Sequence, residues 1–341
     1  MIFKRQIWSA PAERSDDGAS DRLGSATRSN PKRRRASLVT AVQICLVALA
    51  TTFAFTGCSR TNSPPLAIEH FREVTDEAGR RVTVPQKIDR IVSLAPNLTE
   101  IVYSVGAGDQ LVGDTTYCDF PEPAKSVAKI GDTMHPSIER IIALKPQIVL
   151  VSTASQLEAF TKQLDEQHIA VYVTDPQSFD DALKSIQTLG DVLNHHDPAT
   201  TLVDELRRRS SAVEAATKAS QPVRVFYQVS GEPLYTIGRE SYLTDLVRRA
   251  GGVSVTADVP GAFPRFSDEA ALALRPDAVI LSTGGSMGEA NAAVAPSLKN
   301  SPAVLNNRVY RINGDLLSRP GPRLVDGLEA MARALHPEAF R

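Results

Sequence analysis

The chain has 341 residues, of which 42% are hydrophobic, so it is long enough for two domains that bury real cores. Its formal net charge of −1 argues against a nucleic-acid partner, because proteins that coat nucleic acid carry a basic surplus. Of its three cysteines only Cys118 lies in the globular part, which excludes a disulfide framework there.

Residues 1–58 have the layout of a secretory leader. A polar stretch ends in the basic cluster at residues 32–35, an apolar run follows at residues 38–57, and Cys58 comes next. Cations before an apolar segment with small residues at its end are typical of secreted proteins. We expect a leader with a disordered n-region, then a tether over residues 59–70, and a folded part outside the cytoplasm. The apolar run could instead remain as an uncleaved membrane anchor.

Residues 71–177 predict a first α/β domain. Polarity alternates around the sequence Asp76-Glu77-Ala78-Gly79, which is typical of a β-hairpin. Short apolar strands are expected at residues 90–95, 110–113, 147–152 and 170–174. Helical spacing separates them at residues 99–105, 138–144 and 157–167. Strands that alternate with helices predict a parallel or mostly parallel sheet covered on both faces.

Residues 178–220 differ from the domain before them. Apolar residues such as Leu183, Ile186 and Leu189 recur at helical spacing, and the pattern continues for longer than a loop requires. Pro198 lies inside the segment and is expected to kink or divide the helix. We predict that this segment links two domains.

Residues 221–341 predict a second α/β domain. Strands are expected at residues 224–229, 277–282 and 308–312, and helices at residues 243–250, 268–274 and 322–336. Residues 138–152 and 268–282 share a helix, a basic residue followed by proline, and an apolar strand. This repeat predicts two similar lobes, and the cleft between two lobes is the usual place for a ligand.

Five stretches, in this order, resemble the helical-backbone periplasmic binding proteins of iron-siderophore, haem and cobalamin importers. They are residues 90–100, 117–121, 141–146, 238–243 and 319–323. The resemblance extends over residues 88–337. It implies an α/β fold of two Rossmann-like lobes joined by one long helix, with limited hinge motion and the ligand between the lobes.

Within that family, residues 117–121 and 315–323 are most similar to the cobalamin-binding branch. The resemblance implies that Pro96 and Tyr117 line the N-lobe wall of the ligand site. It also implies that Tyr235 and Phe263 contact the ligand from the C-lobe, and that Asp315 and Arg319 lie on the rim. Cobalamin is a corrin plate fringed by amides, so apolar faces would pack on it while polar side chains meet the amides. The tryptophans of that branch fall on Thr133 and Phe263 here, which leaves another corrinoid or a chelate open.

The family also docks on its permease through one carboxylate per lobe. The matching residues are Glu139 and Glu269, at equivalent points of the internal repeat, where charge-assisted pairs with arginines would fix the docking orientation. Both are also ordinary glutamates of a first helical turn, favoured by the helix dipole. The sequence Phe55-Thr56-Gly57-Cys58 resembles a lipobox, which implies that Cys58 is acylated and anchors the protein to the membrane.

Several of these residues have a second interpretation. Tyr117 could be a core tyrosine, and Phe263 could pack on its own loop. Cys118 is expected to be a buried small hydrophobe. Arg319 and Arg323 lie near the start of the last helix, where the dipole disfavours cations, so we expect each to have a ligand or carboxylate partner.

We expect a binding protein and not an enzyme, since a Walker A loop and an HExxH sequence are both missing from the sequence. A zinc- or manganese-binding relative would need three or four ligands at the cleft, and only His135 lies near its expected mouth. Haem-binding relatives often place a tyrosine where Asp132 stands. We therefore predict no metal site and no cofactor.

The resemblance thus implies a monomeric extracytoplasmic lipoprotein that captures cobalamin or a related corrinoid and delivers it to an ABC permease driven by a separate ATPase. The main alternative is a ferric-siderophore binding protein, which would need more basic side chains in the cleft. A tethered sensor or adhesion module without a transport partner is a further alternative of a different class.

Overall fold

The computed structural model describes residues 70–152, 157–285 and 292–341, all of which belong to the unit Pro65–Arg341. The predicted leader, the predicted lipidation site Cys58 and nearly all of the tether lie outside these residues. No helix in the described part combines the length and the apolar character that a bilayer crossing requires.

The first lobe is built on a parallel sheet of order β4-β3-β5-β6. Its strands are β3 (Ile91–Ser93), β4 (Leu111–Asp114), β5 (Ile148–Ser152) and β6 (Ala170–Thr174). The predicted hairpin is also present, as the antiparallel pair β1 (Phe71–Thr75) and β2 (Arg81–Pro85). The helices of this lobe are α1 (Pro96–Ser104), α2 (Ile138–Ala143) and α3 (Leu157–Asp165), with 3-10 turns η1 (Gly108–Gln110) and η2 (Glu122–Ser126).

Alternate residues of β5 belong to two different cores, which shows that the sheet is covered on both faces. Ile148 and Leu150 pack in the cluster that contains residues of α1, whereas Val149 and Val151 pack in the cluster that contains residues of α2 and α3. Side chains of a strand point alternately to the two faces, so a sheet between two helical layers needs apolar residues at every position. This explains the continuous apolar strand that the sequence contains.

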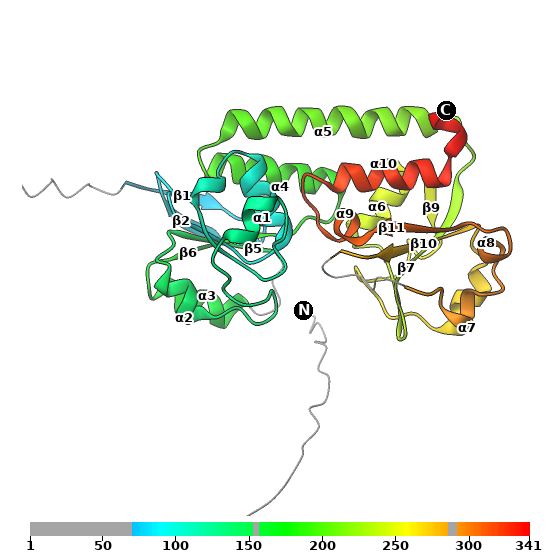
Figure 1. Cartoon of the computed structure of the whole chain (residues 1–341), viewed down its shortest axis with the longest axis horizontal. Coiled ribbons are helices and arrows are strands. Elements are labelled where there is room, and N and C mark those ends of the chain that lie inside the picture. Colours follow the sequence, from blue (N-terminus) through cyan, green and yellow to red (C-terminus); the bar gives the residue numbers. More distant parts are fainter. Residues whose placement is uncertain (1–69, 153–156, 286–291) are drawn as a thin grey trace, which may run out of the picture. The chain divides into compact units, whose positions relative to one another are not determined.

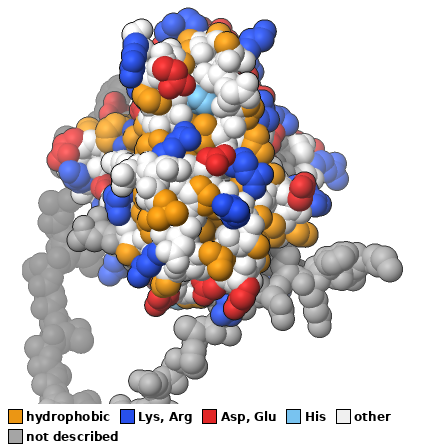
Figure 2. Space-filling view, turned by 90° about the vertical axis from the view of Figure 1, so that its right-hand side faces the viewer, with side chains coloured by type: hydrophobic (Ala, Val, Ile, Leu, Met, Phe, Trp, Pro, Cys, Tyr) orange, Lys and Arg blue, Asp and Glu red, His pale blue; other side chains and the backbone are white. Residues whose placement is uncertain are grey.

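The second lobe has a mixed sheet of order β11-β10-β7, with β8 and β9 both paired to the other edge of β7. Its strands are β7 (Val223–Gly231), β8 (Leu234–Thr236), β9 (Gly252–Ser254), β10 (Ala278–Thr283) and β11 (Val309–Asn313). Its helices are α6 (Tyr242–Arg249), α7 (Asp268–Leu274), α8 (Pro302–Leu305), α9 (Gly314–Ser318) and α10 (Leu324–Leu335), with 3-10 turns η3 (Pro296–Leu298) and η4 (Pro337–Phe340). Acidic and basic side chains are interspersed on the face of this lobe seen in Figure 2.

The predicted linking segment forms two helices, α4 (Phe179–Val192) and α5 (His196–Thr217). Asn194 between them has a left-handed φ of 63°, and Pro198 lies in the first turn of α5, where its missing N–H leaves no internal bond unmade. The division expected near Pro198 is therefore confirmed. In Figure 1 it is α5 that extends over both lobes.

The internal repeat is visible in the backbone. Lys145 after α2 and Arg275 after α7 both have a left-handed φ, of 47° and 44°, and each is followed by a proline and then by a buried strand. A left-handed residue after a helix and a proline next to it stop the helix and redirect the chain. The two lobes thus use the same device to enter β5 and β10, and the predicted two-lobed α/β fold is confirmed.

Gly190 of α4 gives a test of how closely α4 and α5 cross. A Cβ at this position would overlap the Cβ of Ala199 and lie 3.1 Å from the carbonyl oxygen of His195. Replacing glycine by alanine inside a helix ordinarily stabilises it by roughly 1 kcal/mol. Here we expect Gly190→Ala to lower the free energy of unfolding by about 1–3 kcal/mol, because the core becomes overpacked.

Urea unfolding measures this change, with Lys184→Ala, at an exposed position of the same helix, as the control. The control should shift the free energy of unfolding by less than about 0.5 kcal/mol. A stabilised Gly190→Ala protein would show that the two helices are not in such close contact.

Candidate functional site

The predicted site residues gather where parallel strands end. The segment after β3 begins α1, the segment after β4 carries Tyr117, and the segment after β11 forms α9 and leads to Arg319. Carboxyl ends of parallel strands meet at one edge of a sheet, which is where ligands bind in open α/β folds. The two lobes contact each other through these segments.

Arg319 carries the contact between the lobes. Its Nη1 atom donates hydrogen bonds to Glu100 Oε1 and Asp119 Oδ1 of the first lobe, both at 2.9 Å. Its Nη2 atom lies 2.9 Å from Asp315 Oδ1 and 3.4 Å from the carbonyl oxygen of Tyr117. The side chain of Arg319 is only 2% exposed, so its charge is held almost wholly by protein groups.

Glu100 also binds a second arginine of the C-terminal lobe. Arg323 donates from Nη2 to Oε1 at 2.6 Å and from Nε to Oε2 at 2.9 Å, and its guanidinium lies 4.0 Å from the centre of the Phe120 ring. Glu100 is 1% exposed and lies on α1. A bidentate pair of this kind fixes orientation as well as distance.

The pKa of Arg319 reflects these competing influences. Burial by itself lowers the pKa of a guanidinium, but the hydrogen bonds to Glu100 and Asp119 outweigh it and raise the pKa above its ordinary value. Arg319 is therefore always charged. The expectation that Arg319 and Arg323 have a ligand or carboxylate partner is confirmed, and in both cases the partner is a carboxylate.

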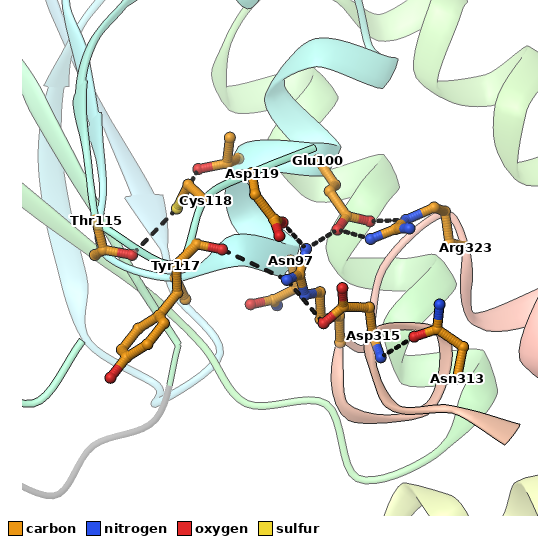
Figure 3. Close-up of polar contacts among 12 residues, drawn as sticks. Asn97, Glu100, Thr115, Tyr117, Cys118, Asp119, Asn313, Asp315 and Arg323 are labelled. Atoms are coloured by element: carbon orange, nitrogen blue, oxygen red, sulfur yellow. Dashed lines mark hydrogen bonds and ion pairs between the residues drawn. The ribbon is translucent and has the colours of Figure 1, made fainter. Parts of the chain in front are cut away.

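Lys129 holds the loop that carries Tyr117 through contacts with Asp114, Cys118 and Ala124. Its Nζ atom lies 2.8 Å from Asp114 Oδ1 and donates to the carbonyl oxygens of Cys118 and Ala124 at 2.9 and 3.0 Å. Three fixed bonds from one ammonium tie the two ends of the loop together. Tyr117 itself is 36% exposed, and Figure 3 shows its ring pointing away from the ion cluster.

Cys118 is a packing residue, as expected. Its thiol is 1% exposed and lies within hydrogen-bond distance of the hydroxyls of Thr99 and Thr115. Burial raises the pKa of the Cys118 thiol, so it stays protonated and is a poor nucleophile.

A pocket of about 440 Å³ opens in the second lobe beside this contact. None of the described residues that line it has a charged side chain. They are Tyr227, Gln228, Val229, Ser230, Gly231, Tyr242, Leu243, Phe263, Ser282, Ala292 and Ser318. Phe263 is 47% exposed, so its ring is available to a ligand.

A larger depression, of about 770 Å³, lies in the first lobe between β2, α3 and β6. None of the predicted site residues lines it. Volume alone is a poor guide to the ligand site, because this depression is lined by the charged side chains of Arg80, Arg81, Lys162 and Asp165 and by none of the predicted residues.

The structure corrects the expected positions of Asp315 and Arg319, and it does not bring Pro96 and Tyr235 to the described lining of the pocket. Asp315 and Arg319 were expected on the rim, but both are buried in the ion cluster, because Arg319 turns inward to reach Glu100. Pro96 is buried at the first position of α1. Tyr235 is half-buried in β8, where its backbone forms an antiparallel β-bridge with Arg265. It is not among the described residues that line the pocket.

Glu100 and Asp119 were not anticipated from the sequence. Glu100 lies in the first two turns of α1, seven residues after the end of a buried strand, and seven consecutive residues of that helix, from Pro96 to Val102, are buried. A glutamate within a fully buried helical stretch requires a cationic partner. That pattern was the available signal for Glu100.

The predicted docking residues have matching local structure. Glu139 and Glu269 are each the second residue of a helix, α2 and α7, whose N-cap is Ser137 or Ser267. Both glutamates are exposed. In Figure 1 the two helices lie on the side of the lobes that faces away from α5. Hydrogen bonds from its own amide and from Ser137 lower the pKa of Glu139, so it is ionised at neutral pH.

Comparisons with known proteins agree with this geometry. A family model described as periplasmic binding protein matches residues 91–316. An uncharacterized ABC transporter substrate-binding lipoprotein of Bacillus subtilis is 33% identical over 275 residues, covering 79% of this chain and 86% of the relative.

Two solved structures are also similar. The periplasmic vitamin B12-binding protein of Vibrio cholerae matches with a TM-score of 0.65 and 27% identity, over 74% of this chain and 98% of that one. A possible iron-binding periplasmic solute-binding protein of Staphylococcus epidermidis matches with a TM-score of 0.62 and 28% identity, over 73% and 99%.

Asp114, beneath the Tyr117 loop, makes the stability of the protein depend on pH. Burial raises its pKa from 3.8 to about 6 although Lys129 opposes the shift, and its Oδ2 atom is buried without a hydrogen-bond partner. Because the folded pKa exceeds the unfolded one, the protonated form stabilises the fold below about pH 4, and this contribution is lost as the pH rises through 6.

Asp114→Asn removes this titration. Between about pH 4 and pH 7 we expect the wild type to lose up to ~3 kcal/mol of unfolding free energy relative to the variant. Chemical denaturation at several pH values measures the difference. A difference that does not change with pH would show that the carboxyl is not desolvated.

Proposed function

The chain belongs to the periplasmic binding protein family and is a substrate-binding protein of the ABC-transporter type, and we propose that its ligand is cobalamin or a related corrinoid. The predicted resemblance to helical-backbone periplasmic binding proteins is confirmed by the family match over residues 91–316 and by the two-lobed structural relatives. The choice of ligand, the site residues and the docking mode are our proposals.

The observation that carries the choice of ligand is the charge at the site. The two arginines beside the pocket, Arg319 and Arg323, are held by three carboxylates, from Glu100, Asp119 and Asp315, so the cluster has a net negative formal charge. No charged side chain lines the described part of the pocket. An anionic chelate would gain little there, whereas a plate with neutral amides suits neutral hydroxyl and amide partners.

The lining residues offer both kinds of contact that a corrinoid needs. Phe263 and Val229 are exposed apolar side chains in the second lobe, suited to packing on the face of the plate. Ser282 and Ser318 are polar and uncharged, whereas the amide of the buried Gln228 is already held by the backbone of Ala293 and Ala295. From the first lobe Tyr117 adds a half-exposed ring. We propose that Pro96 and Tyr235 lie behind this surface and that Asp315 and Arg319 shape it.

Delivery would use the two exposed glutamates. We propose that Glu139 and Glu269 pair with arginines of an ABC permease, which a separate ATPase drives, while the binding protein performs no chemistry on the ligand. The protein would act outside the cytoplasm as a monomer, anchored through lipid on Cys58. Its similarity to a substrate-binding lipoprotein of Bacillus subtilis supports this arrangement.

A ferric chelate is the second candidate ligand. The similarity to a possible iron-binding protein of Staphylococcus epidermidis, at 28% identity, favours it as much as identity alone favours cobalamin. We favour the corrinoid because no charged side chain lines the described part of the pocket.

Titration of the purified protein with cyanocobalamin, dicyanocobinamide and a ferric hydroxamate, followed by visible absorbance, tests the proposal. We expect saturable binding of a corrinoid, and Phe263→Ala should weaken it by roughly tenfold to a hundredfold, as expected for loss of about 1.5–3 kcal/mol of apolar contact. The control is Phe71→Ala, which removes an exposed phenylalanine of β1 far along the chain from the pocket residues.

Saturable binding of the ferric hydroxamate alone would transfer the proposal to the second candidate. No binding of either corrinoid by the wild type would refute the choice of ligand and leave the fold and the family unaffected.

The docking proposal is tested by uptake. The double variant Glu139→Ala with Glu269→Ala should bind ligand as the wild type does but support at least tenfold less uptake, because the docking pairs are lost. Asp268→Ala, beside Glu269 on α7, is the control and should leave uptake unchanged. Normal uptake by the double variant would exclude docking through these residues and favour a sensor without a transport partner.

A further inference from the structure

One buried carboxylate of the first lobe holds two arginines of the second lobe. Glu100 accepts three hydrogen bonds of 2.6 to 2.9 Å, two from Arg323 and one from Arg319. Both partners of the Glu100–Arg319 pair are almost fully buried, with 1% and 2% of their side chains exposed. Removing one partner of such a pair leaves an uncompensated buried charge, so the pair constrains how far the lobes can separate.

The pair is directly connected to the walls of the proposed ligand site. Ser318 lines the pocket of the second lobe, and the next residue, Arg319, reaches the first lobe. There it also binds the carbonyl oxygen of Tyr117 and the carboxylate of Asp119. The position of Tyr117 relative to the pocket is therefore set through Arg319.

A second ion cluster joins the linking segment to the second lobe at the start of α4, and it differs in its exposure. Arg249 of α6 pairs with Asp180 of α4 at 2.7 Å, with Glu214 of α5 at 2.6 Å and with Asp245 at 2.8 Å. The Asp180 side chain is 70% exposed. Exposed ion pairs contribute little and yield easily, whereas the geometry of a buried, bidentate pair is costly to break. Of the two contacts, the Glu100 cluster is the more restrictive.

We propose that Glu100 is a positioning residue that latches the Tyr117 loop of the first lobe to the segment 319–323 of the second, and thereby slows release of the bound ligand. The part about ligand release rests on the proposed function; the latch itself does not. Asp119, which is 43% exposed at its side chain, supports the same contact from the surface.

The latch is tested without ligand by hydrogen–deuterium exchange of the full chain, followed by mass spectrometry. In Glu100→Gln we expect amide exchange to become at least tenfold faster in both segments 115–121 and 319–324, while β5 and β10 stay protected. Asp119→Asn should give a smaller increase in the same two segments. The matched control is Glu329→Gln on α10, which removes one carboxylate partner of Arg209 on α5. This control should not change amide exchange in either segment.

Ligand release is measured on the same variants by stopped-flow displacement of cyanocobalamin. Glu100→Gln should raise the dissociation rate about tenfold and leave the association rate nearly unchanged, as expected when a buried charge contact between the two lobes is lost.

Each outcome bears on the latch. If neither Glu100→Gln nor Asp119→Asn exchanges faster than Glu329→Gln in the two segments, the latch is refuted. If Glu100→Gln also loses protection in β5 and β10, the variant has unfolded and Asp119→Asn decides: faster exchange in both segments supports the latch, and unchanged exchange refutes it. If the wild type binds no cyanocobalamin, the proposed ligand is wrong, and the exchange data still decide the latch.

Discussion

A guanidinium enclosed between two lobes is the constraint on which the site depends. Water cannot reach Arg319 to any extent, so protein carboxylates must meet its charge. Those carboxylates come from α1, from the loop after β4 and from α9. These three segments follow strands of two separate sheets. Because hydrogen bonds of about 2.9 Å tolerate little displacement, the two strand-end edges are held at a defined spacing. The pocket of the second lobe and the exposed ring of Tyr117 are both next to this contact.

The same contact has an electrostatic effect. The two arginines of this contact, Arg319 and Arg323, already have carboxylate partners and are not available to an anion. A site that recognised an anion would keep such side chains available. The described lining of the pocket instead offers the hydroxyls of Ser282 and Ser318 and the exposed ring of Phe263, which suit the uncharged, amide-bearing ring system that we propose. Similarity of 27% and 28% to a B12-binding and a possible iron-binding protein does not separate these ligands, so our proposal of a corrinoid rests on the uncharged lining of the described pocket.

Local patterns in the sequence predicted most of the fold. The apolar strands, the hairpin around Gly79 and the repeat ending in Lys145-Pro146 and Arg275-Pro276 follow from periodicity and turn chemistry, which act within a few residues. The strands β8 and β9 were not predicted, because three residues are too few to show a period. The pairing of Glu100 with Arg319 spans 219 positions, and nothing in the spacing of either segment reveals it. The family resemblance placed Arg319 on the rim, whereas the fold buries it.

One hydrophobic cluster contains residues of β5 and α1 in the first lobe, of α4 and α5, and of β7, β10 and α10 in the second. The lobes therefore share one core through the linking helices, and each lobe also has a smaller core of its own. Neither half could bury its share of that cluster if the chain were cut between α5 and β7, so the two halves depend on each other for stability. Because this shared interior is closely packed, the lobes can move relative to each other only through small adjustments of side chains. The shared core therefore favours a stiff protein with small lobe movements over one whose lobes swing freely about a hinge.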